Sequence, residues 1–230
     1  MVRKLRIAPT NYPQHIYNRG NNKSICFIDA SDFKAFAAFL KKYTNQFDVQ
    51  LHAWVFMTNH FHLLATPQTE NAISKMMQGL GRDYAQYFNF KYNRTGTLWE
   101  GRFNSCLVDS ESYLLQLYKY IEHNPVRAGM VSNAADYSWS SYQINGLGKE
   151  STLVCFHEYY LSLGTTKLSR LKAYNQFLEQ PLTEFELNNI RQCVKSGNTL
   201  GSNKFKQRLS KLCGCELEPK KIGRPNKNKL

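Results

Sequence analysis

The chain has 230 residues, which suits one domain or one domain with an extension, and 30 Lys and Arg against 17 Asp and Glu give a net charge of +13. A chain this basic favours an extended polyanion, most often a nucleic acid, as its partner, and a merely soluble basic surface is the alternative. No apolar run reaches membrane-spanning length, so an integral membrane protein is not expected.

The cysteines and the first residues bear on the cellular compartment. The six cysteines are scattered, and no second pair or nearby histidine joins Cys213 and Cys215 to complete a zinc site. The opening stretch MVRKLRIAPTNYP is basic but lacks the apolar core of a signal peptide. We therefore expect a reduced, cytoplasmic protein whose cysteines are mostly buried small hydrophobic residues.

The first predicted element is a strand at residues 15–18, which runs into a turn at residues 19–22. A helix is predicted within residues 30–47, because apolar residues recur there at helical spacing. Ser31 or Asp32 is its candidate N-cap.

Two strands and a long helix come next along the chain. Residues 48–57 and 60–67 predict a hairpin of two strands joined by a short turn. Residues 71–93 predict a long helix, although Gly79 and Gly81 both disfavour an unbroken one.

A loop at residues 94–103 and a strand at residues 105–109 precede a helix within residues 111–125, which Pro125 ends. The order strand-helix-strand-strand-helix-strand-helix matches a ferredoxin-like split β-α-β unit, an antiparallel sheet with helices on one face. We therefore predict an α+β domain over residues 1–145.

The rest of the chain predicts an extension of short helices, at residues 139–143, 157–164, 168–180, 183–197 and 202–214. We assign residues 146–215 to a helical, DNA-binding extension and residues 216–230 to a basic, disordered tail. Residues 204–230 carry nine Lys and Arg against two Glu, a net charge of +7. Within them, Gly223-Arg224-Pro225 is similar to the short Gly-Arg-Pro elements that enter AT-rich minor grooves, and a solvated tail is the alternative.

The stretch MTNHFHLL, residues 57–64, places two histidines one residue apart in an apolar run. Alternate side chains of a strand share a face, so His60 and His62 should lie side by side, with Phe61 and Leu63 buried on the other face. Two imidazoles at this spacing suit a metal ion or a phosphate, and two ordinary surface histidines are the alternative.

A second group of polar residues follows in LYKYIEHNPVRAG. Tyr120 and Asn124 are four residues apart, which places them on the same face of one helix. If that face packs near the hairpin, two imidazoles, a carboxamide and a phenol converge. Imidazole nitrogens with an amide oxygen suit Mg²⁺ or Mn²⁺, and a tyrosine beside a metal-bound phosphate is a plausible nucleophile.

These motifs together carry a resemblance to a known family. NHFHLL, TGTLWEGRF and YIEHNPVRAG, in this order along the chain, together resemble the single-tyrosine HUH transposases, which are insertion-sequence-200-like. Within that group the chain most resembles the REP-associated tyrosine transposases, which HIYNRGNN and the Gly-Arg-Pro tail also match. The likeness is good over residues 13–145 and looser beyond.

The resemblance implies a function and a role for each matching residue. His60 and His62 match the paired metal ligands, Asn124 matches the third ligand, and Tyr120 matches the nucleophile. Enzymes of this kind cut single-stranded DNA at repeats that form hairpins, leaving a 5′-phosphotyrosine link and a free 3′-hydroxyl that can reverse the step. Mg²⁺ or Mn²⁺ is the implied cofactor.

Other residues near the motifs are weaker candidates for these roles. Tyr118 faces elsewhere on the helix and is the second candidate for the nucleophile. Glu122 and His123 are chemically able to ligate metal, yet both lie off the face of Tyr120. We interpret His15 as a sheet residue rather than a DNA contact, and His52 as structural.

Contacts to DNA outside the site are predicted from basic residues in or near the motifs. The candidates are Arg19, Arg82, Arg94, Arg102, Arg127 and Arg224. The aromatic run YAQYFNFKY, residues 84–92, has rings suited to stacking on unpaired bases, but its helical spacing favours core packing.

The sequence thus predicts a metal-dependent DNA transposase, active on single-stranded DNA and DNA hairpins, with no membrane partner. The alternative is a catalytically silent, domesticated nucleic-acid-binding protein of the same fold. The target sequence, the preferred metal and the choice between monomer and homodimer stay open at this point.

Overall fold

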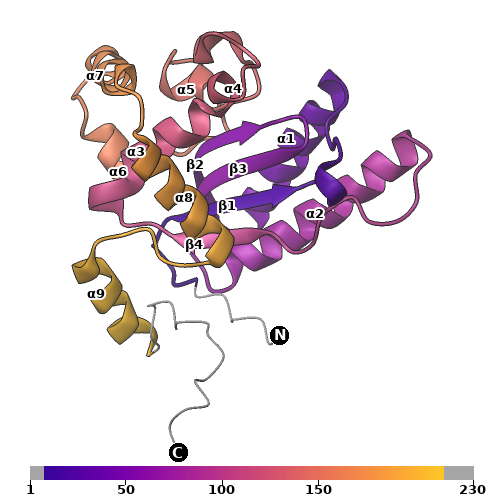
Figure 1. The fold of residues 1–230 in the computed structure, drawn as a ribbon, viewed down its shortest axis with the longest axis horizontal. Helices are drawn as coiled ribbons and strands as arrows, with labels where there is room; N and C mark the ends of the chain where they lie inside the picture. Colours follow the sequence, from indigo (N-terminus) through magenta and orange to yellow (C-terminus); the bar gives the residue numbers. More distant parts are fainter. Residues whose placement is uncertain (1–7, 215–230) are drawn as a thin grey trace, which may run out of the picture.

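The computed structural model describes residues 8–214. The predicted tail at residues 216–230, with Arg224, lies outside the described residues. Within the described part, an antiparallel sheet of four strands forms the centre of the molecule (Figure 1). The strands are β1 (Gln14–Arg19), β2 (Val49–Phe56), β3 (His60–Pro67) and β4 (Asn104–Leu107).

The order of the strands across the sheet is β2-β3-β1-β4, and each pairing is antiparallel. Along the chain the strands alternate with α1 (Ala30–Gln46), α2 (Ala72–Lys91) and α3 (Ser110–Glu122). The resulting order, β1-α1-β2-β3-α2-β4-α3, is the one that the sequence predicts. The α+β fold with an antiparallel sheet is therefore confirmed.

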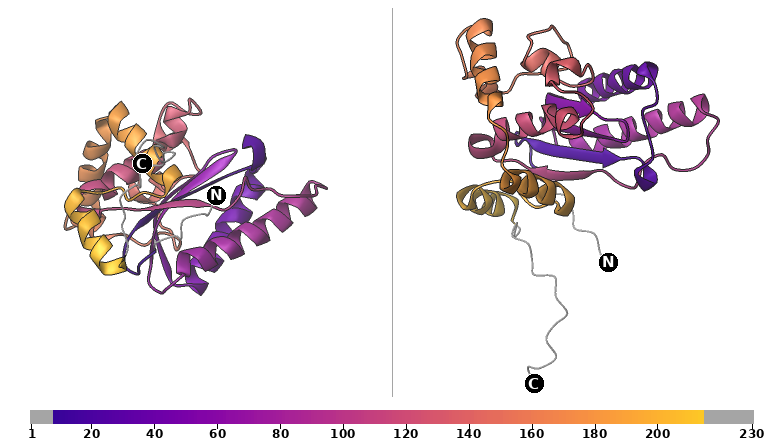
Figure 2. Two further views of the ribbon diagram at one scale, coloured as in Figure 1. Left: turned by 60° about the horizontal axis from the view of Figure 1, so that its bottom comes forward. Right: turned by 45° about the horizontal axis from the view of Figure 1, so that its top comes forward.

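Helices α1 and α2 cover one face of the sheet (Figure 2). The core between them is rich in aromatic rings. Phe36 of α1 contacts Phe56, Phe61 and Tyr84 with ring centroids 4.8 to 5.0 Å apart. Each such fully buried ring contributes roughly 1.5–3 kcal/mol of hydrophobic stabilisation, so this layer anchors the two helices.

Helix α3 packs on the opposite face of the sheet, in a second buried cluster. From the sheet this cluster includes Ala53, Val55 and Leu64, and from α3 it includes Leu114, Leu117 and Ile121. The prediction that the helices lie on one face is therefore wrong. The reason is visible in β2, whose residues from Leu51 to Phe56 are all buried, as both faces of a covered sheet require.

Helix α1 begins earlier than predicted, because its N-cap is Asp29 rather than Ser31 or Asp32. The Asp29 carboxylate accepts hydrogen bonds from the backbone N–H groups of Ser31 and Asp32, at 2.8 and 3.3 Å. The Asp32 carboxylate accepts in turn from the N–H of Asp29, at 3.1 Å. Asp32 is thus the third helical residue of a capping box.

Helix α2 runs unbroken through both of its glycines. A Cβ atom at Gly79 would lie 2.4 Å from the ring of Tyr43, so the missing side chain lets α1 and α2 approach closely. The aromatic run in α2 mostly serves the core, as its spacing predicts: Tyr84 and Phe88 are buried, whereas Phe90 is exposed.

Helix α3 ends at Glu122, and the short helix α4 (Asn124–Arg127) begins directly after His123. The prediction of one helix that carries both Tyr120 and Asn124 is therefore wrong. Pro125 lacks the N–H that would bond to the carbonyl of residue 121, and its ring crowds that carbonyl. The Tyr120 carbonyl accepts a hydrogen bond from the Arg127 guanidinium, at 2.5 Å.

Further helices and the 3₁₀ turn Ala134–Asp136 follow along the chain; most of these helices bury side chains in the cluster on the α3 face, whereas the last one packs against Leu107 of β4 in a separate cluster. They are α5 (Tyr142–Asn145), α6 (Glu158–Leu161), α7 (Lys167–Glu179), α8 (Glu184–Ser196) and α9 (Asn203–Cys213). Ser140 bridges to Val55 at one edge of the sheet, and Leu200 bridges to Val108 beyond the other. Both edges are thus capped by later parts of the chain.

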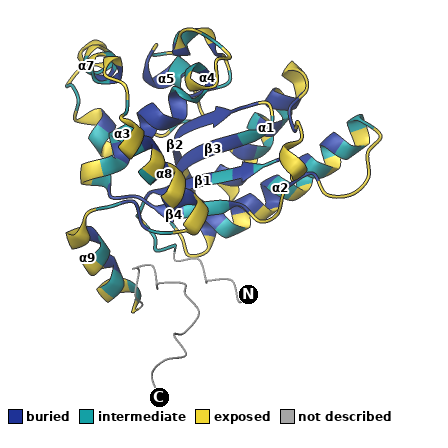
Figure 3. Ribbon diagram, in the orientation of Figure 1, coloured by how far each residue is buried: buried dark blue, intermediate teal, exposed yellow. Residues whose placement is uncertain are grey.

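Burial follows this layered arrangement (Figure 3). The central strands and the inward faces of α1, α2 and α3 are buried, whereas α7, α8 and α9 present long exposed stripes. No helix between residues 8 and 214 combines the length and the apolar character that crossing a membrane requires.

Candidate active site

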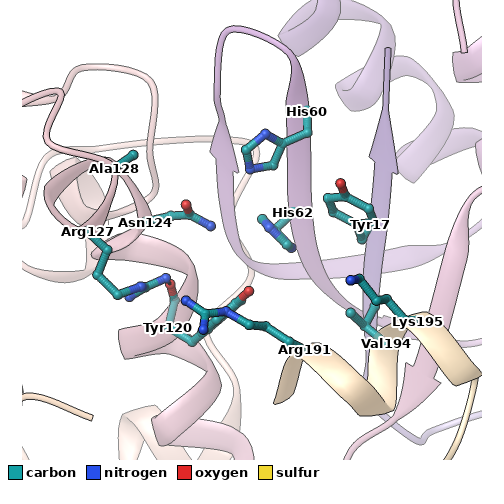
Figure 4. A pocket seen from close by; sticks show the side chains of 10 residues that line it. All are labelled: Tyr17, His60, His62, Tyr120, Asn124, Arg127, Ala128, Arg191, Val194 and Lys195. Atoms are coloured by element: carbon teal, nitrogen blue, oxygen red, sulfur yellow. Dashed lines mark hydrogen bonds between the residues drawn. The ribbon is translucent and has the colours of Figure 1, made fainter. Parts of the chain in front are cut away.

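A pocket of about 280 Å³ opens on the α3 face of the sheet (Figure 4). Strands β1 and β3 contribute Tyr17, His60 and His62 to its lining. Helices α3, α4 and α8, with the residue after α4, contribute Tyr120, Asn124, Arg127, Ala128, Arg191, Val194 and Lys195. Polar groups from distant parts of the sequence therefore meet at one place.

The two histidines lie side by side on β3, as the alternation of strand residues predicts. Their ring centroids are 5.3 Å apart and the rings are perpendicular. Phe61 and Leu63, which alternate with them, are buried in the core against α1 and α2. In the strand register His62 lies opposite Tyr17 and His60 lies opposite Arg19, both of β1.

His60 is held in one orientation by its neighbour. Its Nδ1 lies 2.6 Å from Oδ1 of Asn59, so Nδ1 carries the proton and donates it to the carboxamide oxygen. Burial and, to a smaller extent, the positive charge of Arg19 lower the pKa of His60 to about 4. The ring is therefore neutral at pH 7, and its Nε2 keeps a lone pair.

His62 is held by a third histidine. Nδ1 of His62 lies 2.9 Å from Nε2 of His15, which is completely buried on β1. Burial lowers the pKa of both rings, that of His15 to about 3 and that of His62 well below its ordinary value. When Nδ1 of His62 donates this hydrogen bond, Nε2 of His62 keeps its lone pair and faces a ligand as a base.

Tyr120 and Asn124 both line the pocket, although they belong to different helices. Tyr120 is 5 % exposed, and its ring lies across from His62 with centroids 5.5 Å apart at nearly a right angle. Asn124 begins α4, and its carboxamide points from there toward the histidines (Figure 4). The break at His123 thus still leaves the phenol and the carboxamide at one site.

The Tyr120 phenol has two arginines as neighbours. The guanidinium of Arg127 lies over the Tyr120 ring, 4.5 Å from its centroid. Burial raises the pKa of Tyr120, whereas the charges of Arg127 and Arg191 and a hydrogen bond from Arg191 oppose the rise. Positive charge beside a phenol favours its deprotonated form, which is the nucleophilic form.

The donor set fits a divalent metal ion. His60 and His62 are neutral and can each present an unprotonated Nε2, and the Asn124 carboxamide has no hydrogen bond within the described part of the chain. Among residues 8–214 no three His, Cys, Asp or Glu side chains gather closely enough to hold a metal by themselves. A third protein ligand would therefore be the carboxamide oxygen, which suits Mg²⁺ or Mn²⁺.

Of the predicted DNA-binding arginines within residues 8–214, Arg127 is the one that lines the pocket. Arg19 lies at the end of β1 beside His60, where its guanidinium donates two hydrogen bonds to Glu100, at 2.7 and 2.9 Å. Arg102 is exposed in the loop before β4.

The other two predicted arginines lie away from the pocket. Arg82 is on α2, on the opposite side of the sheet, and forms a salt bridge with Asp83 at 3.0 Å. Arg94 follows α2, and its guanidinium lies 5.4 Å from the centroid of the Phe88 ring.

The weaker candidates have structural surroundings. Tyr118 is completely buried and stacks on Tyr160, so it points away from the pocket. Glu122 accepts hydrogen bonds from three side chains inside the core. The nitrogens of His52 lie 2.8 Å from the Cys155 carbonyl and 2.8 Å from the Thr66 hydroxyl. The structural interpretation of His52 is therefore confirmed.

Four residues in or beside the pocket have a part in the site that the sequence does not predict. His15 does belong to the sheet, as interpreted, but its bond to His62 is an additional feature. Tyr17 could have been found from strand alternation, since it shares a face with His15. Arg191 and Lys195 carried no signal, because nothing local indicates that α8 lies over the pocket.

Comparisons with known proteins identify the family and the fold. A family model described as "Transposase IS200 like" matches residues 10–124, half of the chain. A solved REP-associated tyrosine transposase bound to a REP hairpin is 15% identical, with a TM-score of 0.55; the match covers 68% of this chain and 99% of that chain. At that identity the likeness shows the fold alone.

A second solved structure, of a candidate transposase from Deinococcus radiodurans, is 18% identical with a TM-score of 0.38. That match covers 53% of this chain and 96% of that chain. No curated protein has a significantly similar sequence.

Proposed function

Since the chain belongs to the IS200-like transposases, we propose that it is a metal-dependent enzyme that cuts and rejoins single-stranded DNA through a 5′-phosphotyrosine intermediate. The observation that carries the proposal is the convergence of Tyr120, His60, His62 and Asn124 on one pocket. A phenol, two neutral imidazoles and a carboxamide are the groups this chemistry requires, and they come from three separate elements of the fold.

In the proposed step the phenol oxygen of Tyr120 attacks a backbone phosphorus atom of the DNA. A bond forms between that oxygen and phosphorus, and the bond from phosphorus to the 3′-oxygen breaks. The phenol gives up its proton, and the departing 3′-oxygen takes one up as a hydroxyl. The phosphodiester energy stays in the tyrosine link, so the 3′-hydroxyl can attack it and rejoin the strand without another energy source.

The residues of the pocket have separate roles in this proposal. His60, His62 and Asn124 would hold Mg²⁺ or Mn²⁺, which when bound polarises the phosphate and neutralises developing charge. Asn59 and His15 fix the orientation of the two imidazole rings. Arg127 places positive charge against the face of the Tyr120 ring and favours the phenolate.

We propose DNA hairpins formed by repeats as the substrate. The structural neighbour was solved with a REP hairpin, and the net charge of +13 supports a polyanionic partner. In this proposal residues 1–145 form the catalytic domain, and residues 146–215 form an extension that binds DNA. Because its substrate would be DNA, the enzyme would act in the cytoplasm. Contacts to the DNA backbone outside the pocket are proposed for Arg19, Arg94, Arg102 and Arg224. Arg82 is the least favourably placed of the predicted arginines, because it lies on α2, on the opposite face of the sheet.

The test is to mix the full chain with labelled hairpin oligonucleotides from its own genomic neighbourhood and Mg²⁺ or Mn²⁺. A covalent protein–DNA product is then sought on a denaturing gel. We expect a product that requires the metal, forms with the wild type and is absent for Tyr120→Phe, because the phenyl ring has no attacking oxygen.

Tyr118→Phe is the matched control, since it removes the same group two residues away. It should form the product at the wild-type level. A product that persists in Tyr120→Phe would assign the nucleophile to another residue. Tight hairpin binding by the wild type without any product would favour the catalytically silent binding protein instead.

A further inference from the structure

Helix α8 carries two cations into the pocket from outside the region that the family model matches. That region ends at residue 124, whereas Arg191 and Lys195 belong to α8. Both residues line the pocket together with Tyr120. Figure 4 shows the Arg191 side chain extending from α8 toward Tyr120, with Lys195 on the same helix nearer Tyr17.

The position of α8 is set by its apolar face, not by these cations. Four residues of that face are buried in the cluster that also holds α3: Leu187, Ile190, Cys193 and Val194. Arg191 and Lys195 are four residues apart, so they project from neighbouring positions on the adjacent face. The packing of the helix therefore holds both charges at the rim of the pocket.

Neither cation has an acidic partner among the described residues. The Arg191 guanidinium makes a long hydrogen bond to Oδ1 of Asn188, at 3.4 Å, and no salt bridge involving Arg191 or Lys195 occurs within residues 8–214. Arg19 and Lys91, by contrast, are bound to carboxylates. No Asp or Glu lines the pocket, so with Arg127 it holds three positive charges and no negative one.

Positive charges gathered at one pocket repel each other, and a bound anion would offset this repulsion. We propose that Arg191 and Lys195 bind the phosphodiester backbone of the DNA strand beside Tyr120, so that α8 forms one wall of the active site. This inference rests on the proposed function. Arg191 lies nearest the phenol and contacts the phosphate under attack, and Lys195 contacts the neighbouring phosphate.

Binding is measured first, in a Tyr120→Phe background that cannot form the covalent product. The double variant Arg191→Gln/Lys195→Gln is compared with Lys167→Gln/Lys172→Gln, which removes two exposed charges from α7. Affinity for a single-stranded hairpin oligonucleotide is recorded over a series of salt concentrations. Each phosphate contact contributes about 0.7 to the slope of log affinity against log salt for single strands.

We expect the α8 double variant to lower that slope by about 1.4, two contacts at about 0.7 each, and the α7 double variant to lower it by clearly less, because Lys167 and Lys172 do not line the pocket. With Tyr120 restored, cleavage should fall roughly 10- to 100-fold for Arg191→Gln, since one positioned donor to the transition state is lost. Arg191→Lys should recover part of the rate because it restores the charge.

Equal slope changes for the α7 and α8 variants would overturn the inference, since only the overall charge would then matter. Unchanged cleavage by Arg191→Gln would also overturn it, while the proposed function would stand. A wild type that binds but never cleaves would instead contradict the proposed function, and the slope comparison would still decide whether α8 contacts DNA. Unchanged melting temperatures show that the variants are folded, as expected for exposed side chains.

Discussion

At the scale of single residues, the site depends on histidines that are neutral and fixed in orientation. His15 is central to this, because it does not line the pocket itself yet bonds His62, which does, and its ring lies beside that of Tyr120. Its other nitrogen, Nδ1, is buried and has no hydrogen-bond partner among the described residues. A buried polar atom without a partner costs stability, so a functional reason for it is expected. Orientation of His62 toward the proposed metal would be such a reason.

We predict that His15→Phe keeps a ring of similar shape in the core but lowers metal affinity about tenfold, because His62 loses its orienting bond. Titration of Mn²⁺ into the protein, followed by calorimetry or by electron paramagnetic resonance, measures this without DNA or turnover. His52→Phe is the matched control, since His52 is equally buried and bonded but lies outside the pocket. Equal affinity in the wild type and His15→Phe would contradict the role of His15.

At the scale of elements, α2 shows how two identical residues in one helix differ in their surroundings. Gly79 lies against the ring of Tyr43, which a Cβ atom would approach to 2.4 Å. Gly81 has its nearest neighbour, Nε1 of Trp99, at 3.5 Å from the same added atom, an ordinary contact. The intrinsic preference of a helix for Ala over Gly is the same at both positions, so packing decides the difference.

We predict opposite effects for the two substitutions. Gly79→Ala should lower the free energy of unfolding by roughly 1–3 kcal/mol, because the core must shift to admit the methyl group. Gly81→Ala should raise it by up to about 1 kcal/mol, because it removes the backbone freedom of glycine from the unfolded chain. Denaturant unfolding of the two variants measures both values, and equal effects would show that the α1–α2 contact is more pliable than the structure indicates.

At the scale of the whole molecule, Glu122 joins the end of α3 to segments later in the chain, including α7. Its buried carboxylate accepts hydrogen bonds from the Ser141 hydroxyl at 2.5 Å, the Asn145 amide at 2.7 Å and the Tyr174 hydroxyl at 2.6 Å. These partners lie next to α5, in α5 and in α7. The network therefore ties the end of α3, two residues after Tyr120, to both later helices.

This network makes stability depend on pH. Burial raises the pKa of Glu122 to about 7, while its three hydrogen bonds oppose the rise. The folded chain therefore holds one proton more than the unfolded chain between about pH 4.5 and 7, so this group makes stability fall as pH rises through that window. The slope is at most about 1.4 kcal/mol per pH unit.

Glu122→Gln should remove this contribution, because an amide does not titrate. Denaturant unfolding at pH 5 and at pH 7.5 tests the point: the wild type should lose more stability than the variant over that interval. Equal losses would show that Glu122 is ionised at both values of pH. Glu122→Ala should be destabilising at either pH, by about 1–3 kcal/mol for each buried donor that it leaves without a partner.

Much of the fold follows from local patterns in the sequence. Alternation along residues 60–64 places His60 and His62 on one face and Phe61 and Leu63 on the other, and the structure agrees. The order of strands and helices, the bounds of β3 and the core role of Tyr84 were likewise predictable. Each of these depends on the period of a strand or a helix, which neighbouring residues set by themselves.

Other features depend on contacts between segments far apart in the chain. The second face of the sheet is covered because α3 and α8 bury apolar side chains there. At the break between α3 and α4, the Arg127 guanidinium donates a hydrogen bond to the Tyr120 carbonyl. The same packing brings Arg191 and Lys195 to Tyr120 from about seventy residues away. The sequence by itself determined that a phenol, two imidazoles and a carboxamide belong to the site. Tertiary structure decided which cations face the pocket, because the position of α8 depends on burial against distant segments and not on a local periodic pattern.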